Sequence, residues 1–418
     1  MTERAADPAL LGAAAEPTAR VPRIWAARFA LVWLGFWMAN LAPVQLLLPD
    51  QFDAIDKAHK VGDLGAVLGI GGLVTLATLP VCGALCDHTR SRFGRRRVWM
   101  AGGVLVFAMG VAATGTFHSF AGIAGAWAVA SLGMSMATAG LTASVADQVP
   151  DEQRGEISAA MFGPQALGIL VGLLVLTTAV TSTRGGYVFV AVALLVLAVP
   201  FVRGYRDVAQ DRQVVPLAPM AILSSIWVNP RENPDFAWAF GGRVLVNIGN
   251  ALGTCYLLYF FQDYLRLGDP DTALLVTTAI YLVFTLASAY GGGILSDRTG
   301  RRRIFVATAS AAQAIAALLL VAWPAFGTAL IAAVFLGTGY GAFLSVDQAL
   351  VIHVLPDAHT RAKDLGIMNV GTNAPQALAP VAASVIIGSL GGYLVLFAAA
   401  GATTLAGAAM VFQIKGVR

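Results

Sequence analysis

Long apolar segments recur along the whole chain, and they restrict it to one class of protein. Most are about 17 to 25 residues long, which is the length that an α-helix needs to cross the hydrocarbon core of a bilayer. The 418 residues are 57% hydrophobic and 12% charged, whereas a soluble domain carries about 25% charged residues. The 45 glycines fit helices that approach one another closely in lipid. The sequence therefore predicts an all-α integral membrane protein.

Twelve such segments can be placed, six on either side of a polar break. They cover residues 24–48, 64–86, 98–117, 121–146, 157–180, 187–202, 236–261, 272–295, 304–323, 328–355, 365–387 and 393–412. The break is rich in proline and charge, as linkers are. We therefore predict a disordered tail at 1–23, six-helix bundles at 24–202 and 236–412, a linker at 203–235 and a tail at 413–418.

A basic motif occurs at corresponding places in the two halves. Residues 83–97 read GALCDHTRSRFGRRR, and residues 293–303 read GILSDRTGRRR. The sequence of residues 25–50 can also be aligned with that of residues 238–263. Two halves that start from the same side are parallel repeats, related by an axis along the membrane normal. This is a transporter architecture, with the substrate site expected between the halves near the midplane.

The distribution of Lys and Arg predicts the orientation. With both chain ends inside, only four of the 27 basic residues lie outside, namely Lys57, Lys60, Arg184 and Arg266. Short cytoplasmic loops carry the excess of Lys and Arg. We therefore expect a multi-pass protein of the cell membrane, plasma or inner, with both termini and the linker in the cytoplasm.

The second copy of the basic motif resembles the loop signature of the major facilitator superfamily, G-x-x-x-D-x-x-G-R-R-R, at Gly293, Asp297, Gly300 and Arg301. The duplicated six-helix plan is similar to that superfamily over nearly the whole chain. The resemblance implies twelve transmembrane helices in two six-helix bundles, and secondary active transport by alternating access.

The first copy of the motif points to one branch of this superfamily. Asp87 and Gly94 are seven residues apart instead of three, and the loop is similar to that of the glycoside, pentoside and hexuronide cation symporters and the related sucrose transporter group. Sodium-coupled members of that branch use acidic residues in the second helix. Residues 64–86 hold no internal acid, so we expect coupling to the proton motive force in preference to sodium.

The two basic loops also suggest a gate. A carboxylate at a helix end, beside several guanidinium groups, can bridge neighbouring helices and form a latch that breaks when the halves rock. The predicted cytoplasmic gate has Asp87 and Asp297 as carboxylates, Arg95 and Arg301 as their partners, and Asp147 as a further acceptor. Four loop glycines complete it: Gly83, Gly94, Gly293 and Gly300. The alternative is that the arginines set topology and contact lipid phosphates.

Polar residues inside the second-half segments predict the substrate site. Arg243, Asn247, Asn250 and Thr254 have the spacing of one helical face. We expect that face to look onto a cavity. Further candidates are Tyr340 on the tenth helix, Asn369, Asn373 and Gln376 on the eleventh, and, in the first half, Asn40, Gln45 and Gln165.

Asp347 is the acidic residue of greatest interest inside the predicted spans. An isolated carboxylate at membrane depth is costly, so it should pair, bind a proton or face water. Arg243 is expected at a similar depth. We hypothesise that Asp347 and Arg243 form a protonation-sensitive pair that couples a proton to transport. The alternative is a static ion pair that holds two helices together.

These patterns favour proton-coupled transport of a small polar organic solute, such as a sugar or glycoside. Efflux of drugs or natural products by proton exchange is the alternative, and a receptor or scaffold that transports nothing is the alternative class. An enzyme is not expected, because no convergent nucleophile, base or metal ligands are found. We expect no bound cofactor, no metal and no nucleic-acid partner, and a monomer in the lipid bilayer.

Overall fold

The computed structural model describes residues 20–180, 182–207, 233–299, 302–354 and 361–414, and all regular secondary structure within those ranges is helical. The elements are α1 (Arg23–Ala42), η2 (Pro43–Leu47), α2 (Leu48–Ile55), α3 (Lys60–His88), α4 (Arg95–Thr114), α5 (Phe120–Gln148), η3 (Asp151–Gln153), α6 (Arg154–Thr178), α7 (Thr183–Gly204), α9 (Pro234–Thr254), α10 (Leu257–Tyr259), η4 (Phe260–Tyr264), α11 (Pro270–Thr299), α12 (Arg302–Ala322), α13 (Phe326–Val354), α14 (Arg361–Val385), η5 (Ile386–Gly391) and α15 (Gly392–Val411). Most of the two predicted tails and of the linker lies outside the described residues.

Eleven segments of the described chain are long and apolar enough to cross a membrane. The last of them, Val370–Val411, is 42 residues long and joins α14 to α15 through η5. Gly391 and Gly392 interrupt it with φ values of 126° and 83°, a backbone region that residues with a Cβ rarely adopt. This segment therefore counts as two helices, and the predicted twelve-helix architecture is confirmed.

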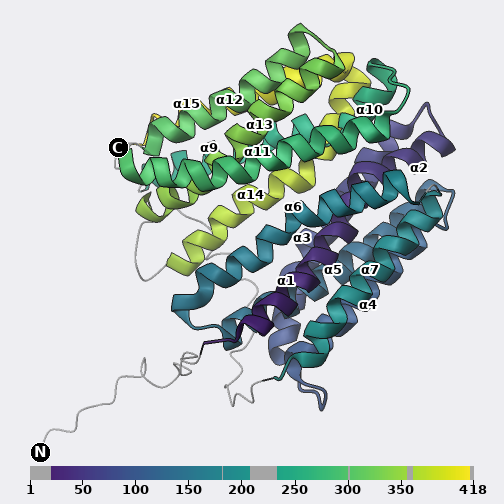
Figure 1. The fold of residues 1–418 in the computed structure, drawn as a ribbon, viewed down its shortest axis with the longest axis vertical. Coiled ribbons are helices and arrows are strands. Elements are labelled where there is room, and N and C mark those ends of the chain that lie inside the picture. The colour runs from purple at the N-terminus through teal and green to yellow at the C-terminus, as the bar shows by residue number, and fades with distance from the viewer. Residues whose placement is uncertain (1–19, 181, 208–232, 300–301, 355–360, 415–418) are drawn as a thin grey trace, which may run out of the picture.

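The helices form two bundles that lie side by side (Figure 1). In the first bundle α4 packs on α5 and α7, α3 on α5, and α1 on α6 and α7. In the second bundle α13 packs on α11 and α12, and α15 on α9 and α12. The bundles touch through α3 against α14 and α6 against α11. These contacts place helices from distant parts of the sequence at the boundary where transporters of this architecture hold their solute.

Glycines allow the closest helix contacts within the first bundle. A Cβ on Gly103 of α4 would collide with the backbone at Ala137 of α5, and one on Gly133 of α5 would collide with the backbone at Phe107 of α4. Small residues permit such approaches in lipid, where association depends on van der Waals packing. The high glycine content is therefore used in packing, as the composition suggests.

Several helices extend beyond the apolar segments that predicted them. The second helix begins at Lys60 and ends at His88, whereas its apolar run is shorter at both ends. The first crossing continues through η2 and α2 to Ile55, and the seventh continues through α10 and η4 to Tyr264. Charged residues at helix ends lie at or beyond the membrane surface, so hydrophobicity alone underestimates helix length.

Candidate functional site

A buried charged pair joins α9 to α13. Arg243 Nε and Nη2 lie 2.6 Å and 2.5 Å from Asp347 Oδ2, and both side chains are buried. Arg243 Nη1 also donates to the carbonyl oxygen of Met368 on α14, at 3.2 Å. Three helices of the second bundle therefore meet at one guanidinium group. The structure brings together the two residues that the sequence suggested as partners.

Two amide side chains of α9, those of Asn247 and Asn250, extend the hydrogen-bond network beyond this ion pair. Tyr340 donates its hydroxyl to Asn247 Oδ1 at 3.3 Å, and Asn247 Nδ2 donates to the Arg243 carbonyl oxygen. One turn further on, Asn250 Nδ2 donates to the Tyr281 hydroxyl at 3.5 Å. Thr254 donates to the Asn250 carbonyl oxygen of its own helix. The polar face of α9 thus packs against α11 and α13.

This arrangement differs from the expected cavity-lining face. Asn247 and Asn250 are only 1% and 4% exposed, because Tyr340 and Tyr281 stack over them with ring centroids 6.4 Å apart. Buried polar groups in a bilayer need partners, and the tyrosine hydroxyls supply them. In this conformation Asn247 and Asn250 are bonded to protein groups and buried.

The remaining substrate candidates are spread over other helices. Asn40, Gln45 and Gln165 are half-buried on α1, η2 and α6, and Gln45 Oε1 is buried without a hydrogen-bond partner. Gln376 is exposed on α14. The side chains of Asn369 and Asn373 lie outside the described residues. Among the described residues, no hydrogen bond connects the first-bundle candidates to the α9 network.

The first basic loop forms an ion-pair network inside the first bundle. Asp147 accepts from Arg96 Nε at 2.8 Å and from Arg95 Nη2 at 3.0 Å. Arg96 Nη1 also lies 2.6 Å from Asp87 Oδ1. The sequence suggested Arg95 as the partner of Asp87, and the structure pairs Asp87 with Arg96 instead. The reason is that α4 begins at Arg95, so its first turn directs the next residue back toward α3.

Gly94 holds the start of α4 in place. Its φ of 99° is in the region that favours glycine, and a Cβ there would collide with the Asp207 carboxylate. Asp207 follows α7 and accepts hydrogen bonds from the backbone N–H groups of Arg96 and Arg97, at 2.9 Å and 3.3 Å. A carboxylate on the free N–H groups of a helix start stabilises that helix. The glycine of the motif thus permits a cap supplied by another helix.

The second basic loop is described only in part. The surroundings of Gly293 and the side chain of Asp297 are not among the described parts of the chain, and Gly300 and Arg301 lie outside the described residues entirely. Arg303 donates a hydrogen bond from Nη1 to the carbonyl oxygen of Ile414, after α15. The basic end of the molecule is defined here by Arg95, Arg96, Arg97, Arg302 and Arg303.

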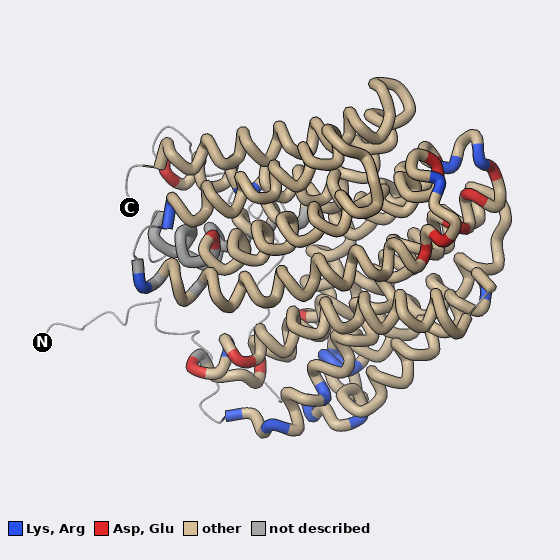
Figure 2. Tube along the Cα trace, turned by 45° about the horizontal axis from the view of Figure 1, so that its top comes forward, with Lys and Arg blue, Asp and Glu red and all other residues tan. Residues whose placement is uncertain are grey.

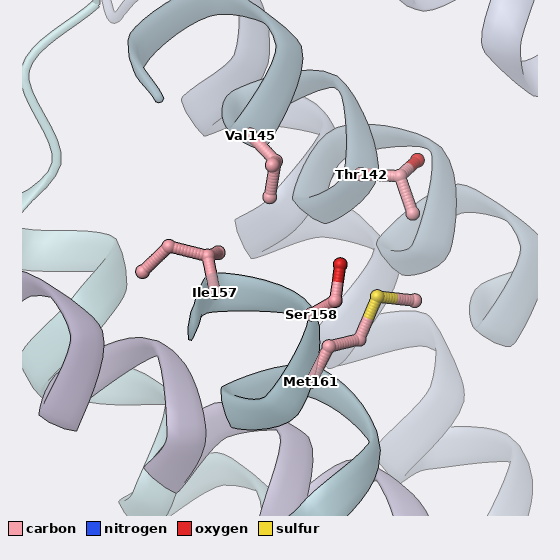
Figure 3. Close-up of a pocket in the computed structure, with 5 residues that line it drawn as sticks. All are labelled: Thr142, Val145, Ile157, Ser158 and Met161. Carbon is pink, nitrogen blue, oxygen red and sulfur yellow. The ribbon is translucent and has the colours of Figure 1, made fainter. Parts of the chain in front are cut away.

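A small cavity lies between α5 and α6 near the basic end. It has a volume of 150 Å³ and is lined by Thr142, Val145, Ile157, Ser158 and Met161. The side chains of Val145, Ser158 and Met161 point into the space between the two helices (Figure 3). Its lining is largely apolar, and the Thr142 hydroxyl bonds its own helix at the Thr138 carbonyl oxygen. The cavity adds a small recess to the first bundle, with no charged group in its lining.

The opposite end of the molecule carries a second charged cluster, which the sequence reasoning missed. Figure 2 shows acidic and basic residues gathered there, away from the basic end. Lys60 Nζ lies 2.7 Å from Asp53 Oδ1 of its own bundle and 2.5 Å from Asp263 Oδ1 of the other bundle. Tyr393 donates its hydroxyl to Asp263 Oδ2 at 2.7 Å. Lys60 is 5% exposed, whereas the side chains of Asp53 and Asp263 are 27% and 35% exposed, so a buried ammonium group is held by two partly exposed carboxylates.

Further hydrogen bonds cross between the bundles at this acidic end. Tyr259 donates to the Pro49 carbonyl oxygen at 2.9 Å, and Tyr256 donates to the Val61 carbonyl oxygen at 3.0 Å. We call these contacts, together with those of Lys60 and Asp263, the acidic-end gate. The internal repeat offered a signal for it, because residues 25–50 align with 238–263 and so place acidic residues at equivalent ends of two helices.

The contact between α3 and α14 extends from the acidic end to mid-membrane. A Cβ on Gly65 would lie 2.5 Å from the Ser384 side chain, and one on Gly72 would lie 2.8 Å from the Ala377 Cβ. One turn closer to the basic end, Leu76 is 54% exposed. The two bundles are therefore packed together at the acidic end, and their contact through α3 ends near the middle of the helix.

The comparison with known proteins decides the family. Residues 26–292 and 244–416 match the Major Facilitator Superfamily. Together the two ranges include almost the whole chain. The chain belongs to this superfamily. It is therefore a multi-pass membrane protein and a secondary transporter, whose substrate is a small molecule, and it is not an enzyme.

Solved transporters share the fold of this superfamily member at low sequence identity. A variant of the peptide transporter POT is 13% identical, with a TM-score of 0.73, over 94% of each chain. The nucleoside transporter NupG, also as a variant, is 12% identical with a TM-score of 0.70, over 93% of this chain and 99% of that one. A POT family transporter in complex with 5-aminolevulinic acid is 13% identical with a TM-score of 0.68, over 94% and 96%. At these identities the likeness shows the fold alone.

One curated relative matches over a short segment. An uncharacterised symporter of Synechocystis sp. is 49% identical over 45 residues, which are 11% of this transporter and 8% of that relative. The matched segment is thus a small part of the relative's length.

Proposed function

We propose that this transporter couples the movement of a small polar organic solute, of the sugar or glycoside kind, to an inward flow of protons. The solute moves by alternating access between the bundles predicted at 24–202 and 236–412. The basic end, both termini and the linker face the cytoplasm of a cell membrane, in keeping with the positive-inside rule. The protein acts as a monomer.

The single observation that carries the proton-coupling proposal is the buried contact of Arg243 with Asp347. Removing the charge of one partner leaves the other charge buried and unpaired, which is strongly unfavourable. Protonation of Asp347 would therefore release Arg243 and loosen the junction of α9, α13 and α14. Asn247 is hydrogen-bonded to the Arg243 backbone and to Tyr340. Protonation of Asp347 would therefore also shift Asn247, one of the amides that we propose to bind the solute.

The proposed solute site contains amides and a phenol rather than fixed charges. Its second-bundle members are Asn247, Asn250, Thr254, Tyr340, Asn369, Asn373 and Gln376, and its first-bundle members are Asn40, Gln45 and Gln165. Such groups both donate and accept hydrogen bonds, as neutral hydroxyl-rich solutes require. The first basic loop supports membership of the glycoside, pentoside and hexuronide symporter branch, and the Synechocystis relative, which is named a symporter, agrees with symport.

The proposed cytoplasmic gate comprises the ion-pair network of Asp87, Arg95, Arg96 and Asp147, with Gly83 and Gly94, and the second-bundle residues Gly293, Asp297, Gly300 and Arg301. In the described part of this gate, every ion pair joins two residues of the first bundle. The bundles are instead joined at the acidic end, so the conformation corresponds to a transporter closed on the side opposite the cytoplasm.

Transport by purified protein in proteoliposomes tests proton coupling at Asp347. An imposed pH gradient should drive solute accumulation by the wild type. Asp347→Asn should lose this accumulation while it retains exchange of labelled for unlabelled solute, since exchange needs no net proton movement. Asp269→Asn, which alters an exposed acid at the other end, should behave as the wild type. Full proton-driven accumulation by Asp347→Asn would refute the proposal.

A thermal-shift screen identifies the solute class before transport is measured. Sugars and glycosides should raise the unfolding temperature of the purified protein, because a bound ligand stabilises the folded state. Stabilisation by lipophilic cations, with none by sugars, would favour efflux of drugs instead. A protein that binds a solute but shows neither uptake nor exchange would be a receptor.

A further inference from the structure

One carboxylate of the acidic-end cluster is left out of the ion pairs. Asp50 lies on α2, one turn before Asp53, and the described residues place no basic group within ion-pair distance of it. Lys60 contacts Asp53 and Asp263 instead. The hydrogen bond that Asp50 receives comes from the other bundle, where Gln262 Nε2 donates to Asp50 Oδ1 at 3.0 Å. Asp50 therefore contributes to bundle contact through an amide, not through a cation.

Gln262 lacks one hydrogen-bond partner in this pairing. Its Oε1 atom is buried and accepts no hydrogen bond. A carboxylate has only acceptor oxygens, whereas a protonated carboxyl group has one donor and one acceptor. A proton on Asp50 would supply the missing donor directly opposite the amide. A carboxyl group and a primary amide can then exchange two hydrogen bonds, which satisfies both groups.

Two further carboxylates belong to the elements around Asp50. Asp53 is on the same helix, and Asp271 is in the first turn of α11 in the other bundle. Like charges repel, which disfavours ionising all three carboxylates together. The titratable groups that act on Asp50 from the neighbouring elements are Asp53 on α2, Lys60 on α3, Tyr187 on α7, Tyr259 on α10 and Asp271 on α11.

We propose that Asp50 is a proton-binding site that locks the acidic-end gate. With the proton bound, Asp50 and Gln262 hold α2 against η4 and keep the bundles together. Without it, the Asp50 carboxylate adds a negative charge to those of Asp53 and Asp271 and leaves Gln262 Oε1 unsatisfied. Loss of the proton therefore favours separation of the bundles at this end.

This lock is separate from proton coupling at Asp347. Asp50 lies at the closed end of the molecule, where a proton is exchanged with the medium on that side when the gate opens. Acid on that side should close the gate, and alkali should open it. The proton at Asp50 sets which conformation the transporter occupies, and the inference does not depend on whether Asp347 carries a transported proton.

The distance between the bundles at the acidic end tests the proposal. Spin labels on Ala58→Cys and Gly268→Cys, two exposed loop positions on opposite bundles, report this distance by pulsed dipolar spectroscopy. The full chain is used after Cys82, Cys86 and Cys255 have been replaced by alanine. As the pH rises, the population should pass from a short to a long distance. One titrating proton changes the ratio of open to closed by up to about tenfold per pH unit.

Variants assign the effect to Asp50. Asp50→Asn, which keeps a donor and an acceptor opposite Gln262, should hold the short distance at every pH. Gln262→Leu removes the lock, so the transition should occur at a lower pH. His59→Gln should keep the pH dependence of the wild type. An unchanged pH dependence in Asp50→Asn, or a wild-type distance that does not respond to pH, would each overturn the proposal.

Discussion

Arg243 places both its Nε and Nη2 atoms against one oxygen, Oδ2, of Asp347, at 2.6 Å and 2.5 Å. Arg243 lies on α9 and Asp347 on α13. Their side chains are only 3% and 7% exposed, so the pair is almost fully shielded from solvent. A pair of this kind either fixes two helices or responds to a proton. Each role predicts a different behaviour of a neutral double variant.

The double variant Arg243→Gln with Asp347→Asn separates stability from coupling. Either single change leaves a buried charge unpaired and should cost about 3–5 kcal/mol in the free energy of unfolding. The double variant removes both charges and should recover most of that loss, as measured by thermal unfolding in detergent. It should still fail to accumulate solute on a pH gradient. Recovery of proton-driven accumulation in the double variant would show that the pair is only structural.

The contacts of Asp207 and Gly94 predict how substitutions there change the stability of the first basic loop. Asp207→Ala removes the acceptor of two backbone N–H groups at the start of α4, and loss of a helix cap costs about 0.5–2 kcal/mol. Gly94→Ala forces a Cβ into a conformation that favours glycine, at a cost of about 1–3 kcal/mol. Both variants should lower the unfolding temperature. Gly155→Ala, where an added Cβ meets nothing within 4 Å, should not lower it.

Gly72→Val tests the contact between the bundles. The added side chain would meet both the Cβ and the carbonyl oxygen of Ala377, at 2.8 Å and 3.0 Å from the new Cβ. We expect α3 and α14 to separate, which lengthens the distance between labels at positions 58 and 268. The matched control is Gly62→Val on the same helix, where an added Cβ meets nothing within 4 Å. An unaltered distance in Gly72→Val would mean that this contact does not hold the bundles together.

His59 and Asp56 predict a pH effect confined to the loop between α2 and α3. His59 Nδ1 lies 2.8 Å from Asp56 Oδ2, and this hydrogen bond raises the pKa of His59 above its usual range. The same bond lowers the pKa of Asp56. The stabilisation from His59 is fully present below its unfolded-state pKa and is lost as the pH rises through the raised folded-state pKa. The contribution from Asp56 is present above its unfolded-state pKa and is lost as the pH falls through its lowered one.

Asp56→Asn should return the pKa of His59 toward its usual value. The measurement is a histidine-selective NMR titration of the full chain, with His59→Gln used to assign the signal. Because both side chains are exposed to solvent, the unfolding temperature should change little. A pKa of His59 that is unaffected by Asp56→Asn would contradict the pairing.

The sequence by itself determined the class, the twelve helices and the duplication. Apolar runs of membrane length admit helices because a bilayer offers no partner for unpaired backbone groups. Helical spacing likewise predicted that Arg243, Asn247 and Asn250 share one face, and the cost of a lone acid in lipid pointed to a partner for Asp347. These inferences succeeded because they depend on local periodicity and on the cost of burying charge.

Only the tertiary structure decided what each face contacts. Spacing cannot tell a cavity-lining face from one covered by Tyr281 and Tyr340, since that depends on how neighbouring helices are rotated. It cannot choose between Arg95 and Arg96 for Asp87, since the start of α4 sets their directions. The acidic-end gate of Lys60 and Asp263 was missed for a further reason. A transporter exchanges its contacts between bundles as it works, so one sequence must encode more than one set of them, and only a structure shows which set is made.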